Sequence, residues 1–192
     1  MDRISSITRE TKETQICLSL NLDGGPVCVD TGIGFFNHML TAFGFYAGFG
    51  LTLTAHGDLE VDGHHTVEDT GIVLGQGLCR ALGDRVGIRR YGFSCIPMDE
   101  ALCRTVLDFS NRAYLVFQAE MPQGSIGAYD ACLTEEFMRA LAMNAGLTLH
   151  QCALYGKNAH HITEALFKSL GLAMRDAVQI EGTGVISTKG VL

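Results

Sequence analysis

Two short stretches of the chain carry the same residues with metal-binding potential. Each contains the pattern His-His-x-x-Glu, in "VDGHHTVEDTGIVLG" and in "KNAHHITEALFKSLG". The six residues are His64, His65, Glu68, His160, His161 and Glu164. A lone His-His pair at a helix start is usually a surface pair or a cap, and an acidic residue in the first turn is ordinary. Finding the arrangement twice favours metal binding.

The spacing within each motif indicates how the ligands would be shared. Neighbouring residues on a helix point about 100° apart, whereas a residue three or four positions on returns to the same side. Glu68 can therefore work with either His64 or His65, but the two imidazoles should serve different metal ions. Imidazole and carboxylate ligands without thiolates favour Mn²⁺, with Fe²⁺, Co²⁺, Ni²⁺ or Zn²⁺ as alternatives.

The motifs open helical stretches in a chain that alternates helices and strands. Apolar periodicity predicts a strand and turn in "TQICLSLNLDGG" and an extended, loosely held tail in "GVISTKGVL". Helices are predicted at 35–47, 66–82, 133–144 and 162–178. Further strands are predicted at 50–57, 92–97, 103–109, 113–119 and 146–154.

The two motifs belong to an internal repeat. "GLTLT" in the first half matches "GLTLH" in the second, and each His-His pair begins ten residues after its match ends. When the upstream helical segments are aligned with a two-residue slip, His38 falls opposite Glu136. The sequence therefore predicts one α/β (α+β) domain over residues 1–192. It would be internally duplicated, with a sheet-and-helix-pair unit in each half (about 1–90 and 91–192).

Adding His38 and Glu136 to the two motifs gives eight ligands. Shared between two metal ions they supply four protein ligands each, so an octahedral ion would keep positions for substrate or water. Neither H-E-x-x-H nor zinc-ribbon cysteine spacing occurs, which excludes an ordinary zinc protease. There is no G-x-G-x-x-G and no P-loop, so no nucleotide site is predicted.

Basic residues are few, 14 in all, so their positions are informative. Arg90, Arg112 and Lys189 stand in "RRYGF", "DFSNRAY" and "STKG", and Lys168 follows Glu164 by one helical turn. Each of them taken alone is better explained as a solvated side chain. Together with a helix N-terminus, converging Arg and Lys side chains would suit a phosphate group.

The overall composition excludes several classes of protein. With 47% hydrophobic residues in 192, the chain can bury a sizeable core. A net charge of −7 argues against nucleic-acid binding. No apolar stretch approaches the roughly 20 residues that span a bilayer, so no membrane partner is expected. Seven cysteines without C-x-x-C spacing, and a polar N-terminus unlike a signal peptide, indicate a cytoplasmic protein with reduced thiols.

Several longer strings, in order along the chain, resemble one enzyme family. They are "TGIGFFNHML", "GDLEVDGHHTVEDTGIVLG", "IPMDEAL", "TLH", "HHITEALFKSLG" and the terminal "STKG". From about Arg9 to the C-terminus, the chain resembles the imidazoleglycerol-phosphate dehydratases. The resemblance implies a hydro-lyase of histidine biosynthesis that converts D-erythro-imidazole glycerol phosphate to imidazole acetol phosphate. It also implies a fold like that of ribosomal protein S5 domain 2. The family resemblance further implies two Mn²⁺ ions per active site, and trimers that assemble into a 24-subunit homo-oligomer with active sites between subunits.

Carried over by position, the resemblance assigns roles to individual residues. The metal ligands would be His38, His64, His65, Glu68, His160, His161 and Glu164. The phosphate-binding positions would be Arg90, Arg112, Ser187 and Lys189, with Lys168 after the second motif. Glu13 in "TKET" matches the substrate-contacting acid and is the favoured acid/base, while the catalytic carboxylates Glu68 and Glu164 fix the geometry. The ligands His38, His64, Glu68 and His160 are also expected to contact the substrate.

Two positions depart from the family pattern. Glu136 stands where many relatives have a histidine, and the repeat alignment keeps it as a metal ligand. His150 is the alternative ligand, although its repeat partner is Thr54. Asn37 stands where the family usually has an aspartate, and would weaken a contact that orients an imidazole.

The chemistry implied by the resemblance must remove a proton from a carbon that no carbonyl acidifies. Metal ions on the ring nitrogens would stabilise an imidazolate, whose electrons expel the neighbouring hydroxyl. Glu13 would then remove the C–H proton, with Asp99 as a weaker candidate, and the resulting enol would become the ketone.

Three other functions have to be weighed against this one. A dinuclear metallohydrolase would use the same ligands but release inorganic phosphate. A metal-storage protein would bind metal tightly without turnover, and gives no role to Arg90, Arg112 and Lys189. A purely structural repeat protein leaves the duplicated motif residues unexplained.

Overall fold

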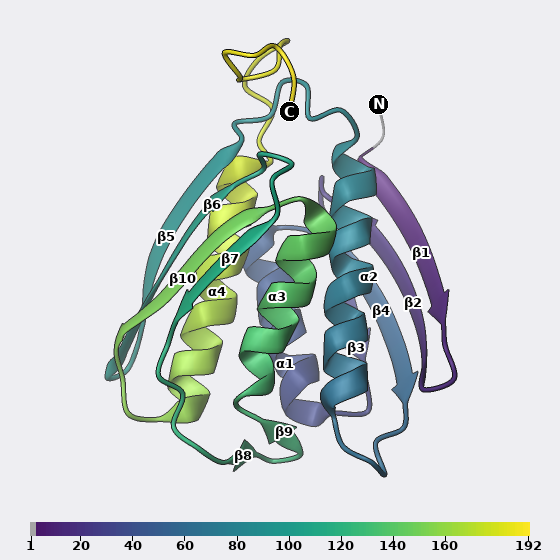
Figure 1. Ribbon diagram of the computed structural model, residues 1–192, viewed down its shortest axis with the longest axis vertical. Helices are drawn as coiled ribbons and strands as arrows, with labels where there is room; N and C mark the ends of the chain where they lie inside the picture. Colours follow the sequence, from purple (N-terminus) through teal and green to yellow (C-terminus); the bar gives the residue numbers. More distant parts are fainter. Residues whose placement is uncertain (1–2) are drawn as a thin grey trace.

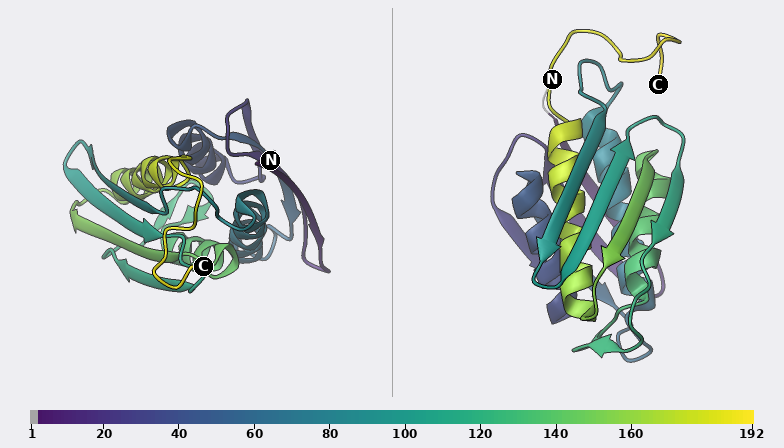
Figure 2. Two further views of the ribbon diagram at one scale, coloured as in Figure 1. Left: turned by 90° about the horizontal axis from the view of Figure 1, so that it is seen from above. Right: turned by 90° about the vertical axis from the view of Figure 1, so that its left-hand side faces the viewer.

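The computed structural model describes residues 3–192 and has three layers. Four helices run in the same direction between two four-stranded sheets, one on either side (Figure 1; Figure 2). No helix among the described residues is both long enough and apolar enough to cross a membrane.

The two sheets have the same strand order. The first is arranged β1-β2-β4-β3, with β1 Ile4–Glu10, β2 Thr14–Asn21, β4 Gly50–Gly57 and β3 Val27–Asp30. The second is arranged β5-β6-β10-β7, with β5 Tyr91–Met98, β6 Ala101–Asp108, β10 Thr148–Tyr155 and β7 Tyr114–Gln118. The helices are α1 Gly34–Ala47, α2 His64–Leu82, α3 Leu133–Ala145 and α4 Ala159–Ala177. A short hairpin, β8 Ser125–Ile126 with β9 Tyr129–Asp130, precedes α3. In each sheet only the last-named strand pairs in parallel with its neighbour, so the repeat extends to strand direction.

The strands form because apolar residues alternate with polar ones and one face of each sheet is covered. In β2, Ile16, Leu18 and Leu20 point inward and are buried, while Cys17 and Ser19 point outward. This period of two is typical of an antiparallel strand with one wet face. The buried faces of both sheets meet the helices in one large hydrophobic core, with a second, smaller cluster between β6 and α4.

The helices pack across the two halves of the repeat through glycines. A Cβ on Gly75 of α2 would lie 2.7 Å from the carbonyl oxygen of Leu141 on α3. A Cβ on Gly171 of α4 would lie 2.7 Å from the carbonyl oxygen of Phe43 on α1. Each half therefore presses its second helix against the first helix of the other half. This packing across the two halves is consistent with one domain of two halves, whose exact bounds stay a prediction.

The predicted fold class and repeated sheet-and-helix unit are confirmed, while several boundaries differ. Helices α2 and α4 begin earlier than predicted, so that both His-His pairs lie in a first helical turn. The sequence does not predict β1, because its inward positions include the polar Ser5. The Ser5 hydroxyl donates a 2.8 Å hydrogen bond to the carbonyl of Gly77 on α2. The short strands β3, β8 and β9 are also absent from the prediction.

The C-terminal tail is held more firmly than its polar sequence predicts. The amides of Gly87 and Glu181 donate to the carbonyls of Gly184 and Gly87, at 3.0 and 2.8 Å. Further along the tail, the Arg90 side chain donates a hydrogen bond to the carbonyl of Ile186. Hydrogen bonds that leave no sequence signature therefore anchor the tail at Gly184 and Ile186, while most of its residues are exposed.

Candidate active site

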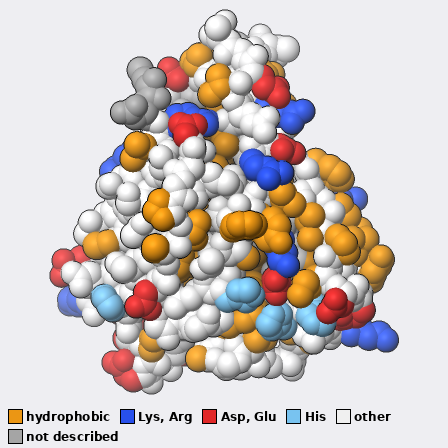
Figure 3. All heavy atoms as spheres, turned by 180° about the vertical axis from the view of Figure 1, so that it is seen from behind, with side chains coloured by type: hydrophobic (Ala, Val, Ile, Leu, Met, Phe, Trp, Pro, Cys, Tyr) orange, Lys and Arg blue, Asp and Glu red, His pale blue; other side chains and the backbone are white. Residues whose placement is uncertain are grey.

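Both His-His pairs lie at the same end of the molecule, where all four helices begin (Figure 1). Figure 3 shows pale-blue histidine side chains gathered near the lower edge of the back face. Side chains in the preceding loops hold the two helix starts. The Asp62 carboxylate accepts from the amide of His64 at 2.7 Å, and the Asn158 side chain accepts from the amide of His160 at 2.9 Å.

One group of three ligand atoms converges between α1 and α4. The Nε2 atoms of His38 and His160 lie 3.5 and 3.1 Å from Oε2 of Glu164, and the three atoms are all within 4.8 Å of one another. Lys168 Nζ donates to the other oxygen, Oε1, at 2.7 Å. Burial alone would raise the pKa of Glu164, but the hydrogen bond and charge of Lys168 outweigh it and lower that pKa. Glu164 is therefore an ionised, oriented carboxylate between two imidazoles.

The matching place between α2 and α3 is less complete. His64 Nε2 lies 3.6 Å from Glu68 Oε2. Glu136 occupies the position on α3 that His38 occupies on α1, because Leu141 and Phe43 follow them by the same five residues and make equivalent glycine contacts. However, the Glu136 carboxylate lies 3.9 Å from Nε of Arg139. Over residues 3–192, the α1–α4 group is the only one that gathers three such donors, so Glu136 as a ligand stays a prediction.

The adjacent histidines point into different surroundings, as their spacing predicts. The ring centroids are 6.1 Å apart for His64 and His65, and 6.0 Å apart for His160 and His161, with the rings nearly perpendicular. The second ring of each pair turns toward a carboxylate that sequence reasoning missed. His65 Nδ1 lies 3.0 Å from Asp58, and His161 Nδ1 lies 2.6 Å from Glu100. These hydrogen bonds raise the pKa of each imidazole.

The two candidate acids sit in equivalent hairpin turns beside these rings. Glu13 lies between β1 and β2, with its carboxylate exposed and Oε2 4.0 Å from Nε2 of His65. Asp99 lies between β5 and β6, with Oδ2 3.5 Å from Nε2 of His161. Both predicted acids therefore reach the end of the molecule that carries the histidines.

The residues predicted to hold a phosphate gather at the opposite end. Arg90, Arg112, Ser187 and Lys189 line one pocket of about 630 Å³. The backbone amide of Arg90 donates to the carbonyl of Ala177, the last residue of α4, at 2.9 Å. Glu164 stands 13 residues earlier on that helix, which corresponds to about 20 Å. Lys168 is not in this pocket but lies beside Glu164.

Arg90 is fixed by contacts within the chain. Its Nε and Nη2 donate to the two oxygens of Asp108 at 2.6 and 3.0 Å, and this pairing raises its pKa. Its Nη1 donates to the carbonyl of Ile186 in the tail. Because these bonds occupy the guanidinium, Arg90 mainly holds the tail in place, which brings Ser187 and Lys189 beside Arg112.

Comparison with known proteins decides the family. Residues 31–174 match the family described as imidazoleglycerol-phosphate dehydratase. The protein of that name from Lacticaseibacillus casei BL23 is 54% identical over 193 residues, covering 99% of this chain and all of that one. The chain belongs to the imidazoleglycerol-phosphate dehydratase family. It is thus a dehydratase, an enzyme of the hydro-lyase class.

Two crystal structures of family members have the same fold. The Staphylococcus aureus N315 enzyme matches with a TM-score of 0.83 and 41% identity, covering 92% of this chain and 99% of that one. The Pyrococcus furiosus protein, crystallised with the compound (S)-C348, matches with a TM-score of 0.86 and 40% identity, covering 97% and 100%.

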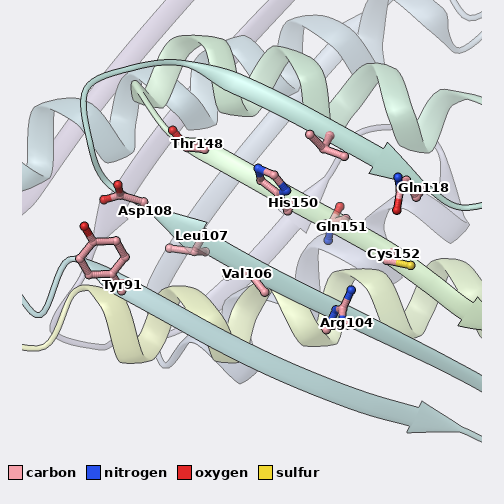
Figure 4. A pocket seen from close by; sticks show the side chains of 11 residues that line it. Tyr91, Arg104, Val106, Leu107, Asp108, Gln118, Thr148, His150, Gln151 and Cys152 are labelled. Atoms are coloured by element: carbon pink, nitrogen blue, oxygen red, sulfur yellow. The ribbon is translucent and has the colours of Figure 1, made fainter.

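The remaining departures from the family pattern have structural explanations. Among residues 3–192, Asn37 makes no hydrogen bond to an imidazole; its Oδ1 accepts from the amide and the hydroxyl of Thr31, at 2.8 and 2.6 Å. An aspartate would offer the same acceptor oxygen. His150 lies on the outer face of the second sheet, in a groove of about 310 Å³ beside Arg104 and Cys152 (Figure 4). Within one chain, His150 therefore faces away from the helices and their ligands.

Proposed function

We propose that this enzyme carries out the metal-dependent dehydration of imidazole glycerol phosphate to imidazole acetol phosphate, a step of histidine biosynthesis. The observation that carries the proposal is the group of His38, His160 and Glu164, three converging donors in a member of this family. Imidazole nitrogen and carboxylate oxygen are the donors that Mn²⁺ accepts.

The other ligands complete two metal positions. His38, His160 and Glu164 would hold one Mn²⁺, while His64 and Glu68, with Glu136, would hold the second. His65 and His161 point away from both groups and would each serve a metal held by a neighbouring copy. When bound, the two metal ions would supply positive charge that favours the anionic form of the substrate's imidazole ring.

The protein's own side chains would then transfer the proton and bind the phosphate. The hydroxyl next to the ring and the proton that Glu13 removes from the adjacent carbon together amount to the one water lost, and the enol that forms rearranges to the ketone. Glu13 suits this role because its carboxylate is exposed and lies within 4.0 Å of a predicted ligand, His65. Arg112, Ser187 and Lys189 would bind the phosphate, and Lys168 would hold Glu164 and approach the same substrate.

One chain cannot apply all these residues to one small molecule, because its histidines and its phosphate pocket lie about 20 Å apart along α4. We therefore propose that active sites form between copies, as expected for trimers assembled into 24 subunits. The outer face of the second sheet supports association, since it exposes several large apolar side chains. They are Tyr91, Phe93, Val106, Tyr114, Leu154 and Tyr155. Sedimentation analysis should show a large homo-oligomer and no free monomer, and a stable, active monomer would rule out shared sites.

The test of the reaction is turnover of imidazole glycerol phosphate by metal-stripped protein, with and without added Mn²⁺. The acetol product should form only after Mn²⁺ is restored, with no release of inorganic phosphate. Phosphate release would instead identify a metallohydrolase. Tight metal binding with neither product would identify a storage or assembly protein.

The cytoplasmic location predicted from the sequence fits the seven cysteines, all within the described residues and all free.

A further inference from the structure

The second histidine of each pair contacts a carboxylate that belongs to no motif. Both oxygens of Asp58 lie 3.0–3.1 Å from Nδ1 of His65. Glu100 Oε2 lies 2.6 Å from Nδ1 of His161. In each case the contact is with Nδ1, which leaves Nε2 pointing away from the carboxylate.

These two carboxylates come from non-equivalent places in the repeat. Asp58 directly follows β4, whereas Glu100 directly precedes β6. The residue equivalent to Glu100 in the first half is Glu13, which directly precedes β2. Glu13 makes no Nδ1 contact; it lies near the other nitrogen of His65, at 4.0 Å. A carboxylate therefore contacts Nδ1 of the second histidine in both halves, but it comes from a different element in each half.

The backbone holds both carboxylates in place. Oε1 of Glu100 accepts from the amides of Lys157 and Asn158, at 3.1 and 2.8 Å, so its other oxygen is aimed at His161. These bonds, with that to His161 as the largest contribution, lower the pKa of Glu100 to about 2. The amide of Asp58 donates to the carbonyl of Glu13 at 3.1 Å, which anchors the residue beside the first hairpin.

A carboxylate against Nδ1 has a defined chemical effect on a metal-binding imidazole. It keeps the proton on Nδ1, leaves the lone pair on Nε2, and fixes the plane of the ring. In the other three predicted histidine ligands, Nε2 itself faces a carboxylate. These are His38, His64 and His160. Nε2 is thus the nitrogen available to a metal ion in His38 and in the four motif histidines.

We infer that Asp58 and Glu100 are positioning residues, which fix His65 and His161 in the tautomer and orientation that donate Nε2 to a metal ion. The inference rests on the proposed function, because it requires a metal. It also explains why the equivalent glutamates differ. Glu100 is committed to His161, while Asp58 serves His65 and leaves Glu13 free for proton transfer.

The test measures how tightly the metal-stripped full-length protein binds Mn²⁺. Mn²⁺ is added in steps, and the EPR signal of the free ion reports how much stays unbound. Asp58→Asn and Glu100→Gln keep the shape and an acceptor oxygen, whereas Asp58→Ala and Glu100→Ala remove it. We expect affinity to fall about 10-fold for the amides and about 100-fold for the alanines, within the range typical of such contacts. Glu60→Gln, which neutralises an exposed carboxylate of the loop that holds Asp58, should bind as wild type.

A purely structural role predicts a different pattern. The variants would then lower the thermal midpoint of unfolding while every variant that folds binds Mn²⁺ as wild type, and that result would overturn the inference. The amide variants keep the test decisive if the alanine variants do not fold. If the wild-type protein itself binds no Mn²⁺, the proposed function fails together with this inference, whereas normal wild-type binding with unaffected variants defeats the inference alone.

Discussion

The two ends of the helix layer differ in how they are built. At the end where the helices begin, the His-His-x-x-Glu motif occurs twice, at equivalent places of a repeat. At the other end, the pocket of Arg90, Arg112 and Lys189 is assembled from two loops and the tail. Under the proposed function, duplication would give two similar half-sites for two metal ions, whereas one substrate would need only one phosphate pocket. Substitutions at the two ends should therefore impair different properties, metal binding and turnover at one end and substrate affinity at the other.

The largest effect is expected from Glu164→Gln, at the centre of the three-donor group. The amide is a poorer donor and leaves the ammonium of Lys168 without its ionised partner. Turnover should fall by more than about 100-fold, beyond the range of changes around a metal site, and bound Mn²⁺, measured by elemental analysis, should fall with it. Glu68→Gln tests the equivalent place in the other half. Full turnover by Glu164→Gln with Mn²⁺ bound would remove Glu164 from the site.

Glu13→Gln should separate proton transfer from metal binding. Loss of a general acid/base costs about 10²–10⁴-fold in kcat, while the Mn²⁺ content should not change. Glu10→Gln, at the end of β1 in the same hairpin, is the matched control and should be active. Near-normal turnover by Glu13→Gln with metal bound would show that another group, such as Asp99, moves the proton.

Arg112→Ala should affect the phosphate end alone. Loss of one hydrogen bond to a charged group corresponds to about 1.5–3 kcal/mol, or at least about a tenfold rise in KM. Mn²⁺ affinity should be unchanged, because Arg112 lies at the opposite end from the histidines. Arg175→Ala, in the last turn of α4, controls for loss of a nearby positive charge. A loss of metal in Arg112→Ala would contradict the separation of the two ends.

The equivalence of the two halves can be tested through their packing. Gly75→Ala and Gly171→Ala would each place a Cβ 2.7 Å from a backbone carbonyl of the facing helix. Overpacking of this kind costs about 1–3 kcal/mol, and denaturant unfolding should show similar losses for both. A large loss in only one variant would show that the halves are not equally close-packed.

The smallest effect is expected from Asn37→Asp, which introduces the residue that the family resemblance implies at this position. The carboxylate oxygen can accept the same two hydrogen bonds from Thr31, so stability should change by less than about 0.5 kcal/mol. Turnover and Mn²⁺ affinity should also stay close to wild type. A marked gain in metal affinity would show that Asn37 does affect an imidazole.

The sequence predicted what is encoded in local patterns. Apolar periodicity located the four helices, and the repeat placed His38 opposite Glu136. That His38 joins His160 and Glu164 of the second motif is seen only in the folded chain. Contacts set by turns and tertiary packing could not be predicted. Asp58 and Glu100 lie in turns, where acidic residues are common, and only the folded chain brings them to Nδ1 of a histidine. Nor could the sequence show that Asp108 pairs with Arg90, because the partners are 18 residues apart without periodic spacing.

The most direct test is an assembly that mixes two defects, one at each end. Chains carrying Glu164→Gln and chains carrying Arg112→Ala with Lys189→Ala would be co-expressed with different tags and purified through both. Each variant alone should have little activity. If the histidine end of one copy works with the phosphate pocket of another, some sites in the mixed assembly are intact, and turnover of imidazole glycerol phosphate should recover well above either parent. No recovery in an assembly shown to contain both chains would contradict the account.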